Sequence, residues 1–306
     1  MKMKKYILFF AILTTILSGC NSDEFDKPDY YNYDAAISKM SRMIVEGSQT
    51  YIGHVKSESE EQPTRGVTLL RMGYLNKKGQ AMQLFLYIVS LGSVSVQVSL
   101  PDDNPVVGNL QTLVEQVAAI ENKGIYVVRG AISGSVFSAN GQPTGIVHRN
   151  GTALRDQIGN TPAFFAILND GSAVCLPASN YNTVKSRIKE AVSGDAQLVG
   201  NGYLITQSDA NAAARSAVGV SKDGSEVFLL VVDGNDFYYS NGISRNDMAL
   251  LMKSCGAHEA MSLSSGNPVT AIWRNERSSS LFELLNKPAN KGLESEISNG
   301  LVIVER

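Results

Sequence analysis

Apolar residues recur along the chain with two periodicities, and these predict helices and strands separately. Helical spacing marks four segments, which run from Asp34 to Gly47, from Asn109 to Gly124, from Val184 to Val192 and from Ser244 to Gly256. Three of them start at a residue whose side chain can cap backbone N–H groups, and the same three stop at a glycine that tolerates the left-handed conformation. With Asp247 in the first turn, Ser244 also approximates a capping box.

Residues that favour strands dominate the intervening segments. A polar stretch over 57–65 precedes three such runs, at 66–74, 82–89 and 94–100, whose order predicts a meander. Residues 125–132 form another apolar run and predict a buried strand. Two further segments, 163–176 and 216–234, each place an Asp-Gly turn between apolar runs and predict hairpins.

This order of elements predicts the fold class. Helices alternate with hairpins and show no regular strand-helix-strand rhythm, which favours an α+β fold with mixed, largely antiparallel β-sheets flanked by helices. No proline-rich linker follows residue 60. We therefore expect one domain over residues 34–306.

Residues 1–20 predict a bacterial lipoprotein signal. Lysines at positions 2, 4 and 5 precede an apolar run over 6–17, which is too short for a permanent membrane span, and Leu-Ser-Gly-Cys follows at 17–20. Cys20 would then become the acylated first residue of the mature chain, and its acyl chains would hold the protein at a membrane.

Residues 21–33 are polar and predict a flexible tether between lipid and domain. The acidic run at 21–26 resembles the export signal that Bacteroidetes lipoproteins carry after the acylated cysteine. That resemblance implies an outer-membrane protein facing the outside of a Gram-negative cell. An ordinary acidic tether accounts for the same residues.

The charge distribution and the cysteine and histidine content limit which ligands, disulfides and metals are expected. The net charge is −2, and basic residues are scattered among acidic ones, so nucleic acid is not an expected ligand. Cys175 and Cys255 remain after acylation, and either a disulfide or two buried free thiols fits the sequence. The three histidines lack metal-ligand spacing, so neither a metal nor another cofactor is expected.

Several motifs, taken in order, are similar to those of the phosphodiester glycosidase family, whose pattern includes AINGGFF, RTAVG, VVDGR, LNLDGGGS and NGL. This chain has AISGSVF at 131–137, RSAVG at 215–219, VVDG at 231–234, MSLSSG at 261–266 and SNGL at 298–301. The resemblance runs from about residue 66 to 305. It implies hydrolysis or binding of a glycan linked through a sugar 1-phosphodiester.

The resemblance also implies a set of site residues. Its catalytic positions are Asp233, Ser264 and Glu294, and its substrate-binding positions are Arg215, Ser133, Gly134, Ser265, Gly266 and Asn299. The planar guanidinium of Arg215 suits a phosphate, although a structural ion pair is the competing interpretation. Asp233 and the 264–267 segment equally fit ordinary turns.

Three departures put catalysis in question. Ser133, Ser264 and Ser295 replace an asparagine, an aspartate and an arginine of the family pattern. Cleavage of a sugar 1-phosphodiester needs a carboxylate near the anomeric carbon and a cation on the phosphate. The sequence therefore leaves two functions open, a glycosidase and a non-catalytic glycan-binding or interaction lipoprotein. The single Trp273 fits either a sugar-stacking or a core position.

Overall fold

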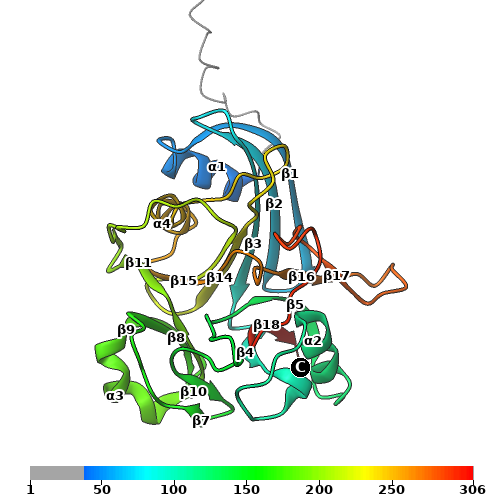
Figure 1. The fold of residues 1–306 in the computed structure, drawn as a ribbon, viewed down its shortest axis with the longest axis vertical. Coiled ribbons are helices and arrows are strands. Elements are labelled where there is room, and N and C mark those ends of the chain that lie inside the picture. The colour runs from blue at the N-terminus through cyan, green and yellow to red at the C-terminus, as the bar shows by residue number, and fades with distance from the viewer. Residues whose placement is uncertain (1–37, 306) are drawn as a thin grey trace, which may run out of the picture.

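The computed structural model describes residues 38–305 and shows an α+β fold in layers, with helices on the outer faces of β-sheets (Figure 1). The expected fold class is confirmed, and all strand pairings between the described strands are antiparallel. The predicted signal, Cys20, the tether and the Asp34 cap lie outside the described residues. Within residues 38–305, no helix has both the length and the apolar character to cross a membrane.

The largest layer is an eight-stranded sheet with the order β1-β2-β3-β14-β13-β15-β11-β12. Its strands are β1 (Ile52–Thr64), β2 (Val67–Asn76), β3 (Ala81–Ser90), β11 (Ala196–Gly200), β12 (Tyr203–Leu204), β13 (Arg215–Val220), β14 (Glu226–Val232) and β15 (Glu259–Ser265).

Two five-stranded sheets complete the β structure of the described part of the chain. The β10 sheet has the order β7-β6-β10-β8-β9, with β6 (Val147–Arg149), β7 (Thr152–Arg155), β8 (Ala163–Leu168), β9 (Ala173–Pro177) and β10 (Ile188–Gly194). The β5 sheet has the order β17-β16-β5-β18-β4, with β4 (Ser95–Ser99), β5 (Val127–Ser133), β16 (Ala271–Arg274), β17 (Phe282–Leu284) and β18 (Gly300–Glu305).

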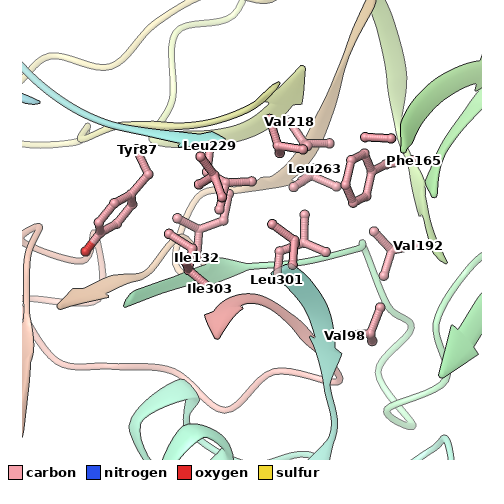
Figure 2. Close-up of a cluster of buried hydrophobic side chains, with 14 of the residues drawn as sticks. Tyr87, Val98, Ile132, Phe165, Val192, Val218, Leu229, Leu263, Leu301 and Ile303 are labelled. Carbon is pink, nitrogen blue, oxygen red and sulfur yellow. The ribbon is translucent and has the colours of Figure 1, made fainter. Parts of the chain in front are cut away.

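The main core lies where these three sheets meet. Side chains of Leu229 and Val218 from the eight-stranded sheet face Phe165 from the β10 sheet and Ile132 and Leu301 from the β5 sheet (Figure 2). All of them are essentially excluded from solvent, so this interior supplies the hydrophobic driving force that joins the sheets.

Among residues 38–305, four helices cover the outer faces. They are α1 (Lys39–Gly47) and α4 (Arg245–Ser254) on the eight-stranded sheet, α2 (Leu113–Glu121) on the β5 sheet and α3 (Tyr181–Val184) on the β10 sheet. Short 3₁₀ turns occur at Pro101–Asp103, Ala178–Asn180 and Lys185–Arg187. Cys175 and Cys255 belong to different cores, and both thiols are free and buried.

The helix boundaries match the predictions in part. Ser244 caps α4, and its Oγ accepts a hydrogen bond from the Asp247 N–H at 3.2 Å. Gly124 and Gly256 follow α2 and α4 in the left-handed conformation, as predicted. The Asn109 cap is wrong, because Thr112 caps α2 in a full capping box with Glu115.

Gly47 ends α1 but not in the predicted conformation. Ser38 caps the helix, and Gly47 has no positive φ. A Cβ on Gly47 would lie 2.6 Å from Ser254 Oγ on α4. The glycine therefore permits close packing of α1 against α4, and the left-handed stop is a wrong prediction.

Three strand assignments also differ from the predictions. The polar stretch over 57–65 belongs mostly to β1, an edge strand whose exposed charges are typical of edges that must not pair with other chains. Strand β4 pairs with β18, so only β1, β2 and β3 form a meander. The predicted helix over 184–192 is largely β10, because tertiary pairing with β6 and β8 overrides its helical periodicity.

A buried ion pair within the β10 sheet forms hydrogen bonds to β4 and so connects the two five-stranded sheets. Arg149 on β6 lies 3.4 Å from the carboxylate of Glu190 on β10 and 3.0 Å from that of Asp103, and donates to Gln97 on β4 at 2.8 Å. Glu190 also accepts the Val98 N–H at 3.0 Å. Burial raises the pKa of Glu190 despite the attraction of Arg149.

Removal of this cation should be costly. We expect Arg149→Ala to lower the free energy of unfolding by about 3–5 kcal/mol at pH 7, because Glu190 would remain buried without its partner. Urea denaturation measures the loss. Lys185→Ala, which removes an exposed pair with Asp156, is the control and should change the free energy of unfolding far less. Equal losses in both variants would contradict this role of Arg149.

Candidate functional site

Hydroxyl groups from three strands meet where the β5 sheet abuts the eight-stranded sheet. Ser133 at the end of β5 lies 3.4 Å, Oγ to Oγ, from Ser216 on β13. The Ser264 N–H on β15 donates to Ser216 Oγ at 3.1 Å, and the Ser264 hydroxyl donates to the Gly134 carbonyl at 2.8 Å. The Thr270 N–H donates to Ser133 Oγ at 3.2 Å.

Asn299 extends this cluster from the start of β18. Its Oδ1 accepts the Ser135 N–H at 2.9 Å, and its backbone carbonyl accepts the Gly134 N–H at 3.0 Å. A Cβ on Gly134 would lie 2.2 Å from Asn299 Oδ1, so the contact requires glycine. We call this cluster the polar seam, and its side chains are those of Ser133, Ser135, Ser216, Ser264 and Asn299, each at most 2 % exposed.

Asp233 lies beside the seam, directly after β14. Its carboxylate accepts the Asn286 side-chain amide at 2.7 Å and the Lys287 N–H at 2.9 Å, and it also bonds to the Tyr239 side chain. Asn286 in turn accepts the Ala271 N–H at 2.7 Å, next to Thr270 of the seam contact. Burial raises the pKa of Asp233 to about 6 although these donors favour the charged form.

Arg215 points to the opposite face of β13 from its neighbour Ser216, as alternate residues of a strand do. Its Nε donates to the Ile243 carbonyl at 2.9 Å, and its Nη2 donates to the Asn211 carbonyl at 2.9 Å and pairs with Asp209 at 3.3 Å. Burial lowers its pKa. This geometry is that of a structural ion pair.

Glu294 is separated from the seam as well. Its Oε1 accepts the Val114 N–H at 3.1 Å in the first turn of α2, and the Leu113 N–H bonds to the same carboxylate. Burial raises its pKa. A carboxylate in this position compensates the positive end of a helix dipole.

Three glycine turns form a rim near the start of β13. The Gly266 N–H donates to the Ala214 carbonyl at 2.9 Å, and a Cβ on Gly234 or Gly242 would lie under 3 Å from the backbone of residues 213–214. The loop between those two glycines exposes the rings of Phe237 and Tyr238, by 72 % and 91 %, in a T-shaped pair. The rim therefore offers aromatic surface beside the Asp233 turn.

The structure thus brings together only part of the predicted set. Ser133, Gly134, Ser264 and Asn299 share the seam, Asp233 adjoins it, and Ser265 and Gly266 form the turn at the rim. Arg215 and Glu294 lie apart from the seam. Sequence reasoning missed Ser216 and Asn286, because a serine inside a strand and an asparagine in a loop carry no signal until the sheets are stacked. Residues 38–305 hold no group of three or more His, Cys, Asp or Glu side chains placed for a metal.

Comparison with known proteins indicates a family. The sequence profile of the phosphodiester glycosidase family matches residues 126–304. The comparison with curated proteins finds no match. Among solved structures, the fold is similar to the catalytic domain of a zebrafish N-acetylglucosamine-1-phosphodiester alpha-N-acetylglucosaminidase auto-inhibited by its pro-peptide. The TM-score is 0.61 at 19% identity over 90% of this chain and 97% of that one.

Two bacterial structures share the fold at lower similarity. A hypothetical protein from Synechocystis gives a TM-score of 0.56 at 11% identity, over 82% of this chain and 64% of that chain. A protein from Burkholderia pseudomallei gives 0.52 at 11% identity, over 74% of each chain. At these identities the likeness concerns the fold alone.

The raised pKa of Asp233 predicts a pH dependence of stability. Because the folded-state pKa of about 6 exceeds the ordinary 3.8, the contribution of this carboxyl is fully present below about pH 4 and is lost as the pH rises through 6. From about pH 4 to 7 the wild-type free energy of unfolding should fall by about 2–3 kcal/mol relative to Asp233→Asn. Urea denaturation across this pH range measures the difference. A constant difference in the free energy of unfolding between the two proteins would contradict the prediction.

Proposed function

Because the chain belongs to the phosphodiester glycosidase family, we propose that its domain binds a glycan linked through a sugar phosphodiester and has lost most of the hydrolytic step. The observation that carries this proposal is the polar seam. The hydroxyls of Ser133 and Ser264, at positions where the family pattern has an asparagine and an aspartate, bond to the protein itself.

The chemistry of cleavage supports binding over hydrolysis. Departure of a phosphate from the anomeric carbon needs a carboxylate beside the sugar and a fixed cation on the phosphate. The Arg215 guanidinium is paired with Asp209 on the other face of β13, and Glu294 caps α2. Loss of one positioned catalytic group lowers a rate by about 10²–10⁴. Together these changes leave a binding site with little catalytic power.

Hydrolysis is the second candidate, and one observation favours it. With a pKa of about 6, Asp233 would be mostly ionised at neutral pH and suited to accept a proton from water. Its oxygens, however, already bond to Asn286, Lys287 and Tyr239. Hydrolysis by Asp233 is therefore the second candidate, and we propose that this carboxylate instead holds the loops of the rim in place.

We propose that the glycan contacts the rim. Sugar rings bind to exposed aromatic faces through their apolar C–H surface, while polar groups at the edge fix orientation. Phe237 and Tyr238 supply such faces, and the turn at Ser265 and Gly266 supplies backbone groups close to the seam. We further propose that acylation of Cys20 anchors the domain to the outer membrane, with the rim accessible to glycans outside the cell.

The binding proposal predicts affinity without turnover. The full chain in detergent should bind an N-acetylglucosamine phosphodiester saturably by calorimetry and release no free sugar above the buffer blank. Tyr238→Ala should weaken binding by about three- to tenfold, because it removes one exposed ring. Tyr203→Ala, 74 % exposed on β12, is the matched control and should bind normally. Multiple turnovers by the wild type would overturn the proposal.

Restoration of the family residues should restore hydrolysis. We expect Ser133→Asn, Ser264→Asp and Ser295→Arg, combined, to raise sugar release at least about a hundredfold above the buffer blank. The same combination with Ser264→Asn supplies equal bulk without the carboxylate and should stay inactive. Circular dichroism verifies folding of both. Equal activity in the two folded variants would show that position 264 has no catalytic part.

A further inference from the structure

A cavity of about 470 Å³ lies far from the seam, where the end of edge strand β1 passes over the β5 sheet. Pro63, Arg129, Trp273, Arg274, Glu276 and Arg277 are among the residues that line it. Its volume falls within the range of about 300–1,000 Å³ typical of small-molecule sites. Arg129 lies in the first half of β5 and Ser133 ends the strand, so these two residues are separated by about 13 Å along it.

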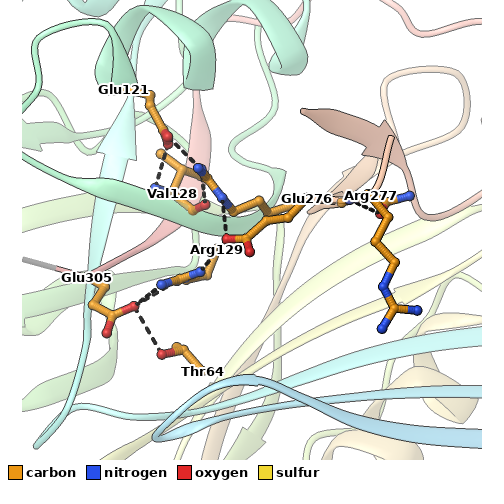
Figure 3. A network of polar contacts seen from close by, with 9 residues as sticks. Thr64, Glu121, Val128, Arg129, Glu276, Arg277 and Glu305 are labelled. Atoms are coloured by element: carbon orange, nitrogen blue, oxygen red, sulfur yellow. Dashed lines mark hydrogen bonds and ion pairs between the residues drawn. The ribbon is translucent and has the colours of Figure 1, made fainter. Parts of the chain in front are cut away.

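Two guanidinium groups in this cavity are each held in place by a carboxylate. Arg129 binds Glu305 through Nε and Nη2, at 2.7 and 2.6 Å. Arg274 binds Glu121 through Nη1 at 2.5 Å (Figure 3). Their side chains are only 19% and 14% exposed. Both cations are therefore ordered before any ligand arrives, which lowers the entropic cost of binding.

A third carboxylate lies between the two arginines but is held weakly. Glu276 Oε1 is 3.3 Å from Arg129 Nη1 and 3.2 Å from Arg274 Nε, whereas charge-assisted hydrogen bonds are usually about 2.7–2.9 Å long. Its side chain is 68% exposed and belongs to the surface turn after β16. The carboxylate of an acidic ligand can therefore displace the carboxylate of Glu276.

The remaining charges favour an anionic ligand. When Glu276 turns outward, Glu305 still balances Arg129, Glu121 balances Arg274, and Arg71 balances Glu61, which also lines the cavity. Arg277 then remains as an excess cation, because within residues 38–305 its guanidinium forms no ion pair, and it extends away from the pairs in Figure 3. The cavity becomes net positive once its own carboxylate is displaced.

An apolar wall completes the cavity. Trp273 on β16 is partly buried, and the Arg71 guanidinium lies 4.7 Å from the centroid of its ring. The guanidinium therefore covers one face of the indole. An aromatic side chain and guanidinium groups along one cavity form a combination that recognises a sugar bearing an acid group.

We propose that this cavity is a second carbohydrate site, specific for an acidic sugar whose carboxylate replaces that of Glu276 between Arg129 and Arg274. Trp273 contacts the apolar side of the sugar ring, and Arg277 contacts the anion or the next acidic unit. The site is independent of the rim, so it provides the chain with a second point of attachment to a charged glycan.

Calorimetry of the full chain with trigalacturonate tests the site. Saturable binding is expected, and Glu276→Gln should strengthen it by about three- to tenfold because the competing charge is removed. Arg277→Ala should weaken binding by a similar factor. Arg187→Ala removes an equally exposed arginine outside the cavity and should have no effect.

Other outcomes would overturn the proposal. Equal affinity for maltotriose would show that the carboxylate is not recognised. Binding of glucose 6-phosphate in the absence of trigalacturonate binding would assign the arginines to phosphate. An unchanged dissociation constant in Glu276→Gln would remove Glu276 as the competing group. Loss of trigalacturonate binding in Tyr238→Ala would place the sugar at the rim, whereas unchanged binding there separates this site from the proposed function.

Discussion

Exclusion of water from the junction between the β5 sheet and the eight-stranded sheet determines what its polar groups can do. A buried hydroxyl without a partner is costly, so Ser133, Ser216 and Ser264 bond to one another and to nearby backbone. The same contacts fix the register at which the sheets meet. A group committed in this way is not available to a substrate unless the junction opens, and the proposed loss of hydrolysis rests on this constraint.

The hydroxyl groups and the guanidinium groups lie in different places on the same strands. On β13, Ser216 faces the seam and Arg215 faces the loop at Asp209, so the strand separates the hydroxyls from the guanidinium. On β5, the polar seam and the arginine cavity occupy opposite ends of one strand. The aromatic rim and the arginine cavity therefore differ in chemistry. Two weak sites on one protein, as proposed, would bind a polymer more tightly than either site alone.

The sequence predicted the local features well and the sheet assembly poorly. The Asp-Gly hairpins and the Ser244 cap depend on neighbouring residues, and the structure has them as predicted. Strand β10 was predicted as a helix, because its pairing with β6 and β8 depends on residues far away in the chain. The same limit applies to the site. Motifs identified Ser133, Ser264 and Asn299 as candidates, but the direction of Arg215 depends on strand alternation relative to a core that sequence alone does not locate.

Recognition of the phosphodiester without its cleavage can be tested in one sample by ³¹P NMR of an N-acetylglucosamine phosphodiester with substoichiometric full-length protein. The diester resonance should broaden on addition of protein and keep its integral over time. Steady growth of a phosphomonoester resonance beyond one equivalent of protein would contradict it.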